Sequence, residues 1–451
     1  MSIRLTVIGA GPGGYETAAS AAEKGFDVTL ISEGPLGGTC LNEGCIPTKC
    51  LCRNAEFLED LAHAEELGVE ASYSFNFQKA MERKEAVVSQ LRSGIEFLLK
   101  KVNIIEGRAF IKDNHTVVVG DQEIESDYII VATGSVSASL PIPGTDLDGV
   151  ISSKEILSLD EIPKKLCIIG AGVIGLEFAS IFNCFGSEVT VLEYCPNILP
   201  RFDIDLAKRL KQSLSKKGIS IITSAKVESI ERSPEGLEVK YQFKENQEAI
   251  IADKVLMAVG RRPNLKSLNF EEAGIETTPR GVVVNEYMQT SVPNIYAIGD
   301  ITGGMMLAHA ATFHGRRVLN HLIAGSPAKG PVDRIRMDII PAAVFTSPEA
   351  ATVGKTEEEC KAEGVAFKSR KSFYRANGKA LSMNAPEGYC KIIEEEKSGR
   401  ILGCHILGAH ASDIVQEVAA IMAGEGTIHD LSSIIHAHPT LAEILLNAAT
   451  Q

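Results

Sequence analysis

The sequence predicts an α/β protein with two Rossmann-like dinucleotide-binding domains and a C-terminal α+β domain. A strand, a GxGxxG turn, a helix and a strand ending in an acid follow one another at residues 5–33, and the same order recurs at residues 167–193. From about residue 336 the pattern changes to a strand, a helix, antiparallel strands and further helices. A length of 451 residues exceeds one ordinary core, so several domains are expected.

The first glycine turn has the context that a dinucleotide site requires. Gly9, Gly11 and Gly14 follow an apolar strand, and the next strand ends at Glu33. Glycines permit a tight turn and close backbone approach, and the N-terminus of the following helix stabilises a pyrophosphate. An acid about 20 residues beyond the turn accepts hydrogen bonds from ribose hydroxyls. The alternative is a glycine-rich strand-to-helix turn that binds nothing, and the complete context favours the binding site.

The second glycine turn also indicates which nucleotide binds. It contains Gly170, Gly172 and Gly175, and Glu193 ends the next strand. A carboxylate there accepts a hydrogen bond from a free 2′-OH and repels a 2′-phosphate, so NAD is favoured over NADP. The alternative is a surface acid at the end of a strand.

The segments between the two turns show further regular elements. A long amphipathic helix is expected at about residues 83–101, followed by hairpins with turns at residues 113–114 and 120–121. Strands ending in glycine are expected at residues 128–134 and 255–260, and residues 141–144 mark a crossover between domains.

The composition excludes several classes of protein. A formal net charge of -13 argues against nucleic acid or an anionic membrane as the main partner. No apolar run approaches the roughly 20 residues that cross a membrane, and no signal peptide precedes the first strand. The ten cysteines are scattered and do not resemble a secreted disulfide framework, so we expect a cytoplasmic protein.

Two cysteines beside the first dinucleotide unit suggest a redox couple. Cys40 and Cys45 are separated by Leu-Asn-Glu-Gly and are expected near the start of a helix, with Lys49 just beyond. A helix N-terminus and a lysine both lower the pKa of a thiol and favour the thiolate. The alternatives are two buried structural cysteines or half of a metal site. No second cysteine pair with zinc-ligand spacing stands nearby, so no metal is expected.

A histidine-rich segment near the C-terminus contains a candidate base. Residues 436–443 read His-Ala-His-Pro-Thr-Leu-Ala-Glu and lead into a helix. A carboxylate near an imidazole fixes its tautomer and stabilises the imidazolium, as a general base requires. The alternative is an arrangement that caps the helix. The cysteine pair upstream favours the base.

These motifs together resemble the pyridine nucleotide-disulfide oxidoreductases, and are most similar to the dihydrolipoamide dehydrogenase branch of that family. The resemblance covers nearly the whole chain. It rests on residues 37–49, both glycine turns, Ala132-Thr133-Gly134, Gly260-Arg261-Arg262-Pro263, Ala297-Ile298-Gly299-Asp300 and residues 436–443.

The resemblance implies a cofactor site for each turn. FAD would be held by Gly9, Gly11, Gly14, Glu33, Lys49, Thr133, Gly134, Asp300, Leu307, Ala308 and His309, and NAD by Gly170, Gly172, Gly175, Glu193 and Gly260. It implies an FAD-binding domain at residues 1–145, an NAD-binding domain at 146–268, a central domain completing the FAD site at 269–336, and a C-terminal dimerisation domain at 337–451.

The resemblance also implies a reaction. Cys40 would be the thiol that meets dihydrolipoamide, and Cys45 would be the charge-transfer thiol beside the flavin. Glu177 would lie near the nicotinamide, paired with Lys49. His438, oriented by Glu443, would take the substrate proton. Electrons would run from dithiol to disulfide to FAD to NAD.

Its partners would be the lipoyl domain of an acyltransferase (E2) component of a 2-oxo acid dehydrogenase complex, the E2 subunit-binding domain, and a second copy of the chain. In that homodimer His438 would act on the other subunit, and the His438–Pro439 bond would be cis.

Three residues depart from the family pattern. Glu43 replaces a small apolar residue, and Ala310 and His314 replace a commoner lysine and glutamate. Glu43 places a negative charge between the cysteines, which should raise thiol pKa values and shift the redox poise.

Other functions share part of this pattern. Glutathione reductase-like and mercuric reductase-like enzymes have the same cysteine spacing. The first would carry basic residues near Glu193, and the second a terminal cysteine pair in place of the Asn-Ala-Ala-Thr-Gln of residues 447–451. A non-catalytic flavoprotein is a further alternative, and the intact set of cysteines, lysine, histidine and glutamate argues against it.

Overall fold

The computed structural model describes residues 2–325 and 335–451, and internal contacts divide the chain into two compact units. The first contains residues up to 50, 79–138 and 260–337, and the second contains residues 51–78, 139–259 and 338–451. Residues 326–334, at the end of the predicted central domain 269–336, lie outside the described part. The second unit includes most of the predicted domain 146–268 together with 337–451, so the four domain boundaries stay a prediction.

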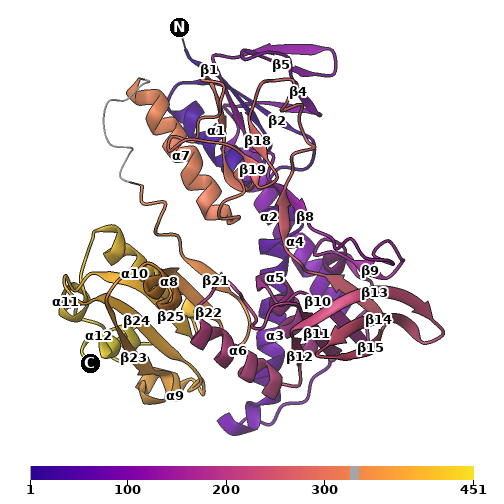
Figure 1. Ribbon diagram of the computed structural model, residues 1–451, viewed down its shortest axis with the longest axis vertical. Helices are drawn as coiled ribbons and strands as arrows, with labels where there is room; N and C mark the ends of the chain where they lie inside the picture. Colours follow the sequence, from indigo (N-terminus) through magenta and orange to yellow (C-terminus); the bar gives the residue numbers. More distant parts are fainter. Residues whose placement is uncertain (1, 326–334) are drawn as a thin grey trace. The chain divides into compact units, whose positions relative to one another are not determined.

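A five-stranded parallel sheet forms the centre of the first unit, in the order β20-β7-β1-β2-β3. Figure 1 labels its strands β1 and β2. Because side chains alternate across a strand, each face of the sheet has its own core. Leu5 and Val7 of β1 face a helical layer, while Ile8 joins the core shared with a small antiparallel sheet. The strands are β1 (Arg4–Ile8), β2 (Asp27–Ser32), β3 (Asn103–Glu106), β7 (Tyr128–Val131) and β20 (Ile295–Ala297).

The helical layer contains α1 (Pro12–Glu23), α4 (Phe77–Leu98) and α7 (Ala308–Ala324), and α1 lies against α7. Helix α4 begins at Phe77, earlier than the expected start near residue 83, and ends at Leu98. Phe77, Ala80 and Met81 are buried, so the apolar face extends one and a half turns upstream of the predicted start. The expected hairpins are β4 (Ala109–Ile111), β5 (Thr116–Val119) and β6 (Gln122–Glu125).

The second unit repeats this plan, which confirms the internal repeat. Its parallel sheet has the order β12-β11-β10-β16-β9, with a three-stranded antiparallel sheet packed beside it. The strands are β9 (Val150–Ile151), β10 (Lys165–Ile169), β11 (Glu188–Glu193), β12 (Ser220–Thr223) and β16 (Lys254–Met257), with β13 (Ala225–Ser233), β14 (Gly236–Phe243) and β15 (Asn246–Ala252). Helices α5 (Val173–Cys184) and α6 (Ile204–Lys216) follow β10 and β11.

The C-terminal part of the second unit is an antiparallel sheet covered by helices, as the α+β prediction requires. Its order is β21-β22-β25-β24-β23, and α10 packs on β22 and β25 while α12 packs on β23 and β24. The strands are β21 (Ala342–Val344), β22 (Ala350–Gly354), β23 (Phe367–Phe373), β24 (Tyr389–Glu395) and β25 (Ile401–Leu407). The helices are α8 (Glu357–Ala362), α9 (Gly378–Ser382), α10 (Ala411–Ala423), α11 (Ile428–Ser433) and α12 (Glu443–Ala449).

The remaining elements are short or carry the site. They are α2 (Gly38–Asn42), α3 (Cys45–Ala62), β8 (Ser135–Ser137), β17 (Arg261–Pro263), β18 (Thr277–Thr278) and β19 (Gly281–Val282), with 3-10 helices η1 (Ala64–Leu67), η2 (Glu155–Ser158), η3 (Gly299–Thr302) and η4 (Tyr374–Ala376). In the described residues, no helix has both the length and the apolar character needed to cross a membrane.

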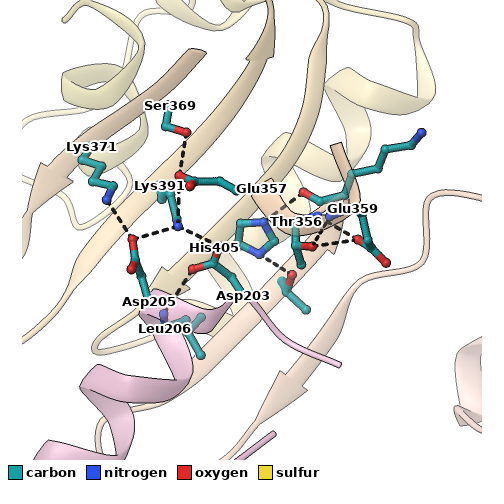
Figure 2. Close-up of polar contacts among 12 residues, drawn as sticks. Asp203, Asp205, Leu206, Thr356, Glu357, Glu359, Ser369, Lys371, Lys391 and His405 are labelled. Atoms are coloured by element: carbon teal, nitrogen blue, oxygen red, sulfur yellow. Dashed lines mark hydrogen bonds and ion pairs between the residues drawn. The ribbon is translucent and has the colours of Figure 1, made fainter. Parts of the chain in front are cut away.

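A buried ion cluster joins α6 to the C-terminal sheet (Figure 2). Lys391 of β24 is almost fully buried, and its Nζ lies 2.7 Å from Asp203, 3.1 Å from Asp205 and 3.3 Å from Glu357. Asp203 is itself fully buried and caps α6 by accepting the Leu206 N–H at 3.1 Å. A buried charge is stable only beside an opposite charge, so Lys391 of the sheet and Asp203 at the start of α6 must stay together. The cluster therefore holds the start of α6 on the sheet.

Replacing Lys391 with Met should therefore destabilise the protein, because Asp203 loses its counter-charge. Removing one partner of a buried ion pair typically costs about 3–5 kcal/mol. Lys371→Met is the matched control, because Lys371 pairs with Asp205 at 2.9 Å where both side chains are well exposed. An exposed pair contributes about 1 kcal/mol or less. Thermal unfolding at pH 7 compares the variants, and an equal fall in Tm for both would contradict this role of Lys391.

Candidate active site

The first glycine turn is built by close backbone packing. A Cβ on Gly9, whose φ is +107°, would lie 2.4 Å from the Ala132 carbonyl oxygen, and a Cβ on Gly14 would lie 1.8 Å from the Gly9 oxygen. A Cβ on Gly11 would meet no protein atom within 4 Å. Gly11 is also the N-cap of α1, which has no side-chain cap. Unpaired helix N–H groups beside open space can bind a phosphate.

The second turn repeats this geometry in the other unit. A Cβ on Gly170 would lie 2.5 Å from the Ala258 oxygen, one on Gly175 would lie 2.0 Å from the Gly170 oxygen, and one on Gly172 would meet no atom within 4 Å. Helix α5 begins after Gly172, again without a side-chain cap. Both turns therefore have the cradle that a dinucleotide pyrophosphate needs.

The two acids lie in different environments. Glu193 is buried, and its carboxylate accepts the Ala171 N–H at 2.6 Å and the Cys195 N–H at 2.7 Å. Glu33 is exposed at the end of β2. The second turn therefore has an acid that the main chain of the protein itself holds in place, which could not be predicted from the matching sequence patterns.

The cysteine segment packs directly on the first turn. A Cβ on Gly38, whose φ is +56°, would lie 2.6 Å from the Gly11 Cα, and the Gly37 N–H donates to the Ala10 oxygen at 2.9 Å. Asn42 then donates to Gly38 O at 2.9 Å. These contacts explain the two glycines before the cysteines and hold α2, which carries Cys40, against the phosphate cradle.

The two cysteines are neighbours in space. Cys40 lies in α2, Cys45 is the first residue of α3, and both are free thiols joined by a hydrogen bond. That hydrogen bond, followed by burial, raises the pKa of Cys40, while the charge of Lys49 opposes the rise. The two thiols therefore titrate as a pair, and the proton they share belongs to the pair rather than to either cysteine alone.

The C-terminal histidine and glutamate form the expected pair. His438 Nδ1 lies 2.9 Å from Glu443 Oε1, and the Thr440 N–H donates to Glu443 Oε2 at 2.8 Å. The Thr440 hydrogen bond first, and then that of His438, lower the pKa of Glu443. The His438 side chain is 78% exposed, whereas that of His436 is 3% exposed and its Nε2 lies 3.0 Å from Glu417. The His438–Pro439 bond is cis, as expected.

Glu177 of α5 is buried and fixed by the main chain. Its Oε1 accepts the Phe345 N–H at 3.0 Å, and the Phe345 oxygen accepts the Cys52 thiol of α3 at 3.5 Å. Lys49 belongs to the first unit and Glu177 to the second, so their predicted pairing stays a prediction.

The other predicted FAD residues lie around the ends of β7 and β20 in the first unit. The Thr133 hydroxyl, just after β7, is buried without a hydrogen-bond partner among the described residues, which suits a ligand contact. Gly134 has a φ of +69°. Asp300 lies in η3, and its Oδ2 accepts the Ser135 hydroxyl at 2.5 Å. Leu307 is the N-cap of α7, and Ala308 and His309 are the first two residues of that helix.

Sequence reasoning missed two residues of this region, Ser135 and Arg261, as site residues. The Arg261 side chain donates to Ser135, which in turn donates to Asp300. The signal available was the position of each residue immediately after a predicted cofactor glycine, Gly134 or Gly260. Gly260 itself has a φ of +108°, and a Cβ there would meet no atom within 4 Å.

Comparison with known proteins defines the class. Residues 3–315 match the pyridine nucleotide-disulphide oxidoreductase family, and residues 340–449 match the dimerisation domain of the same family. The chain belongs to the pyridine nucleotide-disulphide oxidoreductases, whose cofactors are FAD and NAD, and the α/β fold with a dimerisation domain is confirmed.

Named relatives cover nearly the whole chain. Dihydrolipoyl dehydrogenase from Staphylococcus aureus is 42% identical over 98% of this chain and 95% of its own length. Dihydrolipoyl dehydrogenase from Bacillus subtilis (strain 168) is 41% identical with the same coverage. Among solved structures, the HOCl-induced flavoprotein disulfide reductase RclA from Escherichia coli superposes with a TM-score of 0.88 at 32% identity, covering 99% of both chains.

His314, which stands where the family more commonly has glutamate, gives a prediction about how the stability of the protein depends on pH. Its Nδ1 accepts the Gly299 N–H at 3.1 Å, and burial, followed by the charge of Arg317, lowers its pKa from 6.5 to about 4. The unfolded chain therefore binds a proton at a higher pH than the folded protein does. The stability that neutral His314 contributes is complete above pH 6.5 and is lost as the pH falls toward 4.

His314→Asn keeps an acceptor near the Nδ1 position but does not titrate. Between pH 7 and pH 4.5, Tm should fall more steeply in the wild type than in this variant. At about 1.4 kcal/mol per pKa unit, the full effect is on the order of 3 kcal/mol. Parallel curves of Tm against pH for the two proteins would contradict the assignment.

Proposed function

We propose that this chain is an FAD-dependent dihydrolipoamide dehydrogenase that reduces NAD+, the E3 component of a 2-oxo acid dehydrogenase complex. The observation that carries the proposal is the Cys40–Cys45 dithiol held on the first dinucleotide turn by the contact between Gly38 and Gly11. The names of relatives at 42% and 41% identity support the same activity.

The proposed cofactor sites follow from the two cradles. FAD would be held by the first turn with Glu33, Thr133, Gly134, Asp300 and residues 307–309, and NAD by the second turn with Glu193 and Gly260. The orphaned Thr133 hydroxyl and the open space above Gly11 and Gly172 are the observations that suit these ligands. Bound FAD would accept two electrons from the reduced cysteine pair and transfer them to NAD+.

The chain's own cysteines perform the thiol chemistry. A substrate thiolate attacks Cys40 Sγ of the oxidised pair, the Cys40–Cys45 bond breaks, and Cys45 leaves as a thiolate. The second substrate thiolate then attacks the substrate sulfur bound to Cys40. This closes the lipoamide disulfide and releases Cys40, so two electrons move from the substrate to the cysteine pair. The hydrogen bond to Cys45 and the charge of Lys49 suit this sequence.

The division of roles between the cysteines rests on the family resemblance. In the protein chain alone Cys45 is exposed and Cys40 is half-buried. Exposure by itself would therefore suggest Cys45 as the thiol that meets the substrate. The assignment of Cys45 as the thiolate beside the flavin therefore depends on the resemblance, and the Cys40→Ser and Cys45→Ser variants test it.

His438 is the proposed base. Its Nδ1 is engaged by Glu443, so Nε2 is the nitrogen that can accept a proton from a substrate thiol. Glu443 carries the negative charge that stabilises the resulting imidazolium, and its own position is fixed by the Thr440 N–H. The exposure of His438 suits a residue that acts on another subunit.

Glu193 supports NAD as the acceptor. A buried carboxylate held by two backbone N–H groups cannot turn away from a 2′-phosphate, so NADP would be repelled. This argues against a glutathione reductase-like activity. We also propose Lys49 and Glu177 as a pair near the nicotinamide, with the Phe345 amide orienting Glu177.

The proposed partners follow from the activity and the dimerisation domain. The chain would act as a homodimer in the cytoplasm, on dihydrolipoamide carried by the lipoyl domain of an acyltransferase, and would dock on the E2 subunit-binding domain. The match of residues 340–449 supports the dimer.

Cysteine variants test the activity. The wild type should reduce NAD+ with dihydrolipoamide, and should be far less active with glutathione or NADP. Cys45→Ser should lose the long-wavelength thiolate-flavin absorbance on reduction by NADH, whereas Cys40→Ser should keep a thiolate band, and both should lose dihydrolipoamide turnover. Cys184→Ser is the matched control, since this half-buried cysteine lies in α5. Near-native turnover in either test variant would rule out the redox pair.

Mixed dimers test the shared site. His438→Gln should lower turnover about a hundredfold or more, as expected for loss of a general base. If each site combines Cys40 and Cys45 of one chain with His438 and Glu443 of the other, mixing Cys45→Ser and His438→Gln chains should restore one site per heterodimer. Heterodimers verified by tag pull-down that are no more active than their parents would exclude the shared site.

A further inference from the structure

Three side chains from distant segments form a directed hydrogen-bond chain in the first unit. Arg261 Nε donates to Ser135 Oγ at 2.7 Å, and Arg261 Nη2 donates to the Ser135 carbonyl oxygen at 2.7 Å. Ser135 Oγ then donates to Asp300 Oδ2 at 2.5 Å. A hydroxyl has one proton, and a guanidinium can only donate, so the direction from Arg261 to Asp300 is fixed.

The backbone around these residues is also fixed. Arg261 begins β17 and Ser135 begins β8, and the two strands pair antiparallel. Asp300 follows Gly299, whose N–H donates to His314 Nδ1 at 3.1 Å and whose φ is +71°. Thr302 closes the turn by donating to the Gly299 oxygen at 2.8 Å. His314 and Thr302 therefore hold the main chain just before Asp300, and Ser135 holds the Asp300 carboxylate.

The charges of this group explain why an arginine is used. Burial lowers the pKa of Arg261, and the negative charges of Asp300, Cys45 and Glu43 oppose that effect. A ligand that covers Asp300 would remove water from its carboxylate, which is costly without a nearby positive charge. Arg261 supplies that charge through Ser135, while Asp300 uses one of about four acceptor sites for the serine and keeps the others for a ligand.

We propose that Arg261 is a positioning residue for FAD, acting through the Ser135 hydroxyl to orient the Asp300 carboxylate toward hydroxyl groups of the bound FAD. The inference rests on the proposed function, in which Asp300 is one of the residues that hold FAD. Arg262, the next residue, is exposed and serves as the matched arginine outside the chain of hydrogen bonds.

The test is the affinity of the apoprotein for FAD, measured by quenching of flavin fluorescence. Losing one such hydrogen bond should weaken FAD binding about tenfold, since a bond to a charged group contributes about 1.5 kcal/mol or more. Arg261→Met and Ser135→Ala should both show this loss. Arg262→Met should bind as the wild type does, and Ser135→Thr, which keeps the hydroxyl, should recover most of the affinity.

The double variant separates a relay from two independent contacts. If Arg261 acts only through Ser135, the variant with Arg261→Met and Ser135→Ala should bind FAD no more weakly than the weaker single variant. Fully additive losses, or affinities within twofold of the wild type for both single variants, would overturn the proposal. Ser135→Ala removes one oxygen atom, so it remains informative where Arg261→Met fails to fold.

The two proposals fail in different ways. A wild-type protein that binds no FAD, or that does not reduce NAD+ with dihydrolipoamide, would refute the proposed function. A wild-type protein that does both, together with variants that bind FAD normally, would refute only the role of Arg261. Tm of each apoprotein, which should stay close to the wild-type value, separates positioning from general damage to the fold.

Discussion

The site depends on close main-chain contacts that only glycine residues allow, because a side chain at these positions would collide with a neighbouring segment. The Ala132 carbonyl lies where a side chain on Gly9 would be, and the Gly9 carbonyl lies where a side chain on Gly14 would be. Gly11 lies where a side chain on Gly38 would be. Each contact would be blocked by a single methyl group. The cysteine helix can therefore approach the phosphate cradle only because successive glycines leave room for it. The position of the cysteine segment relative to the glycine turn is thus determined by main-chain packing, which is far stiffer than a side-chain contact.

The two dinucleotide units show how one framework is adapted to two purposes. Their glycine contacts agree to within about 0.2 Å, and both helices begin without a side-chain cap. The differences lie in what is added. The first unit has a cysteine segment across its turn and an exposed Glu33, whereas the second has a buried Glu193 bound to its own turn. The shared part carries the fold, and the proposed redox chemistry and choice of nucleotide depend on the added parts.

Much of this structure could be predicted from local sequence patterns, whereas the polar contacts between residues far apart in the sequence could not. The turns at Gly9 and Gly170, the start of α3 near Cys45 and the His438–Glu443 pair each depend on neighbouring residues whose spacing has a direct physical meaning. Ser135 is separated from both Arg261 and Asp300 by more than a hundred residues along the chain, and nothing local links them. The burial of Lys391 could not be predicted either, because a lysine in a strand normally faces solvent. Here its side chain is buried among carboxylates from other elements. The early start of α4 was missed because Phe77 and Ala80 lie before its clearest apolar repeat.

The environment of Glu193 has a consequence for attempts to redesign nucleotide preference. The carboxylate ties the second residue of the glycine turn to the chain beyond β11, because it binds the N–H groups of Ala171 and Cys195 at the same time. A basic residue in its place would bring the charge that a 2′-phosphate needs, but it would leave the buried N–H of Ala171 and the part-buried N–H of Cys195 without an acceptor. Changing preference and preserving the turn are therefore separate requirements. A successful exchange would have to be a coupled set of substitutions that includes a new acceptor for the turn, rather than a change of charge at one position.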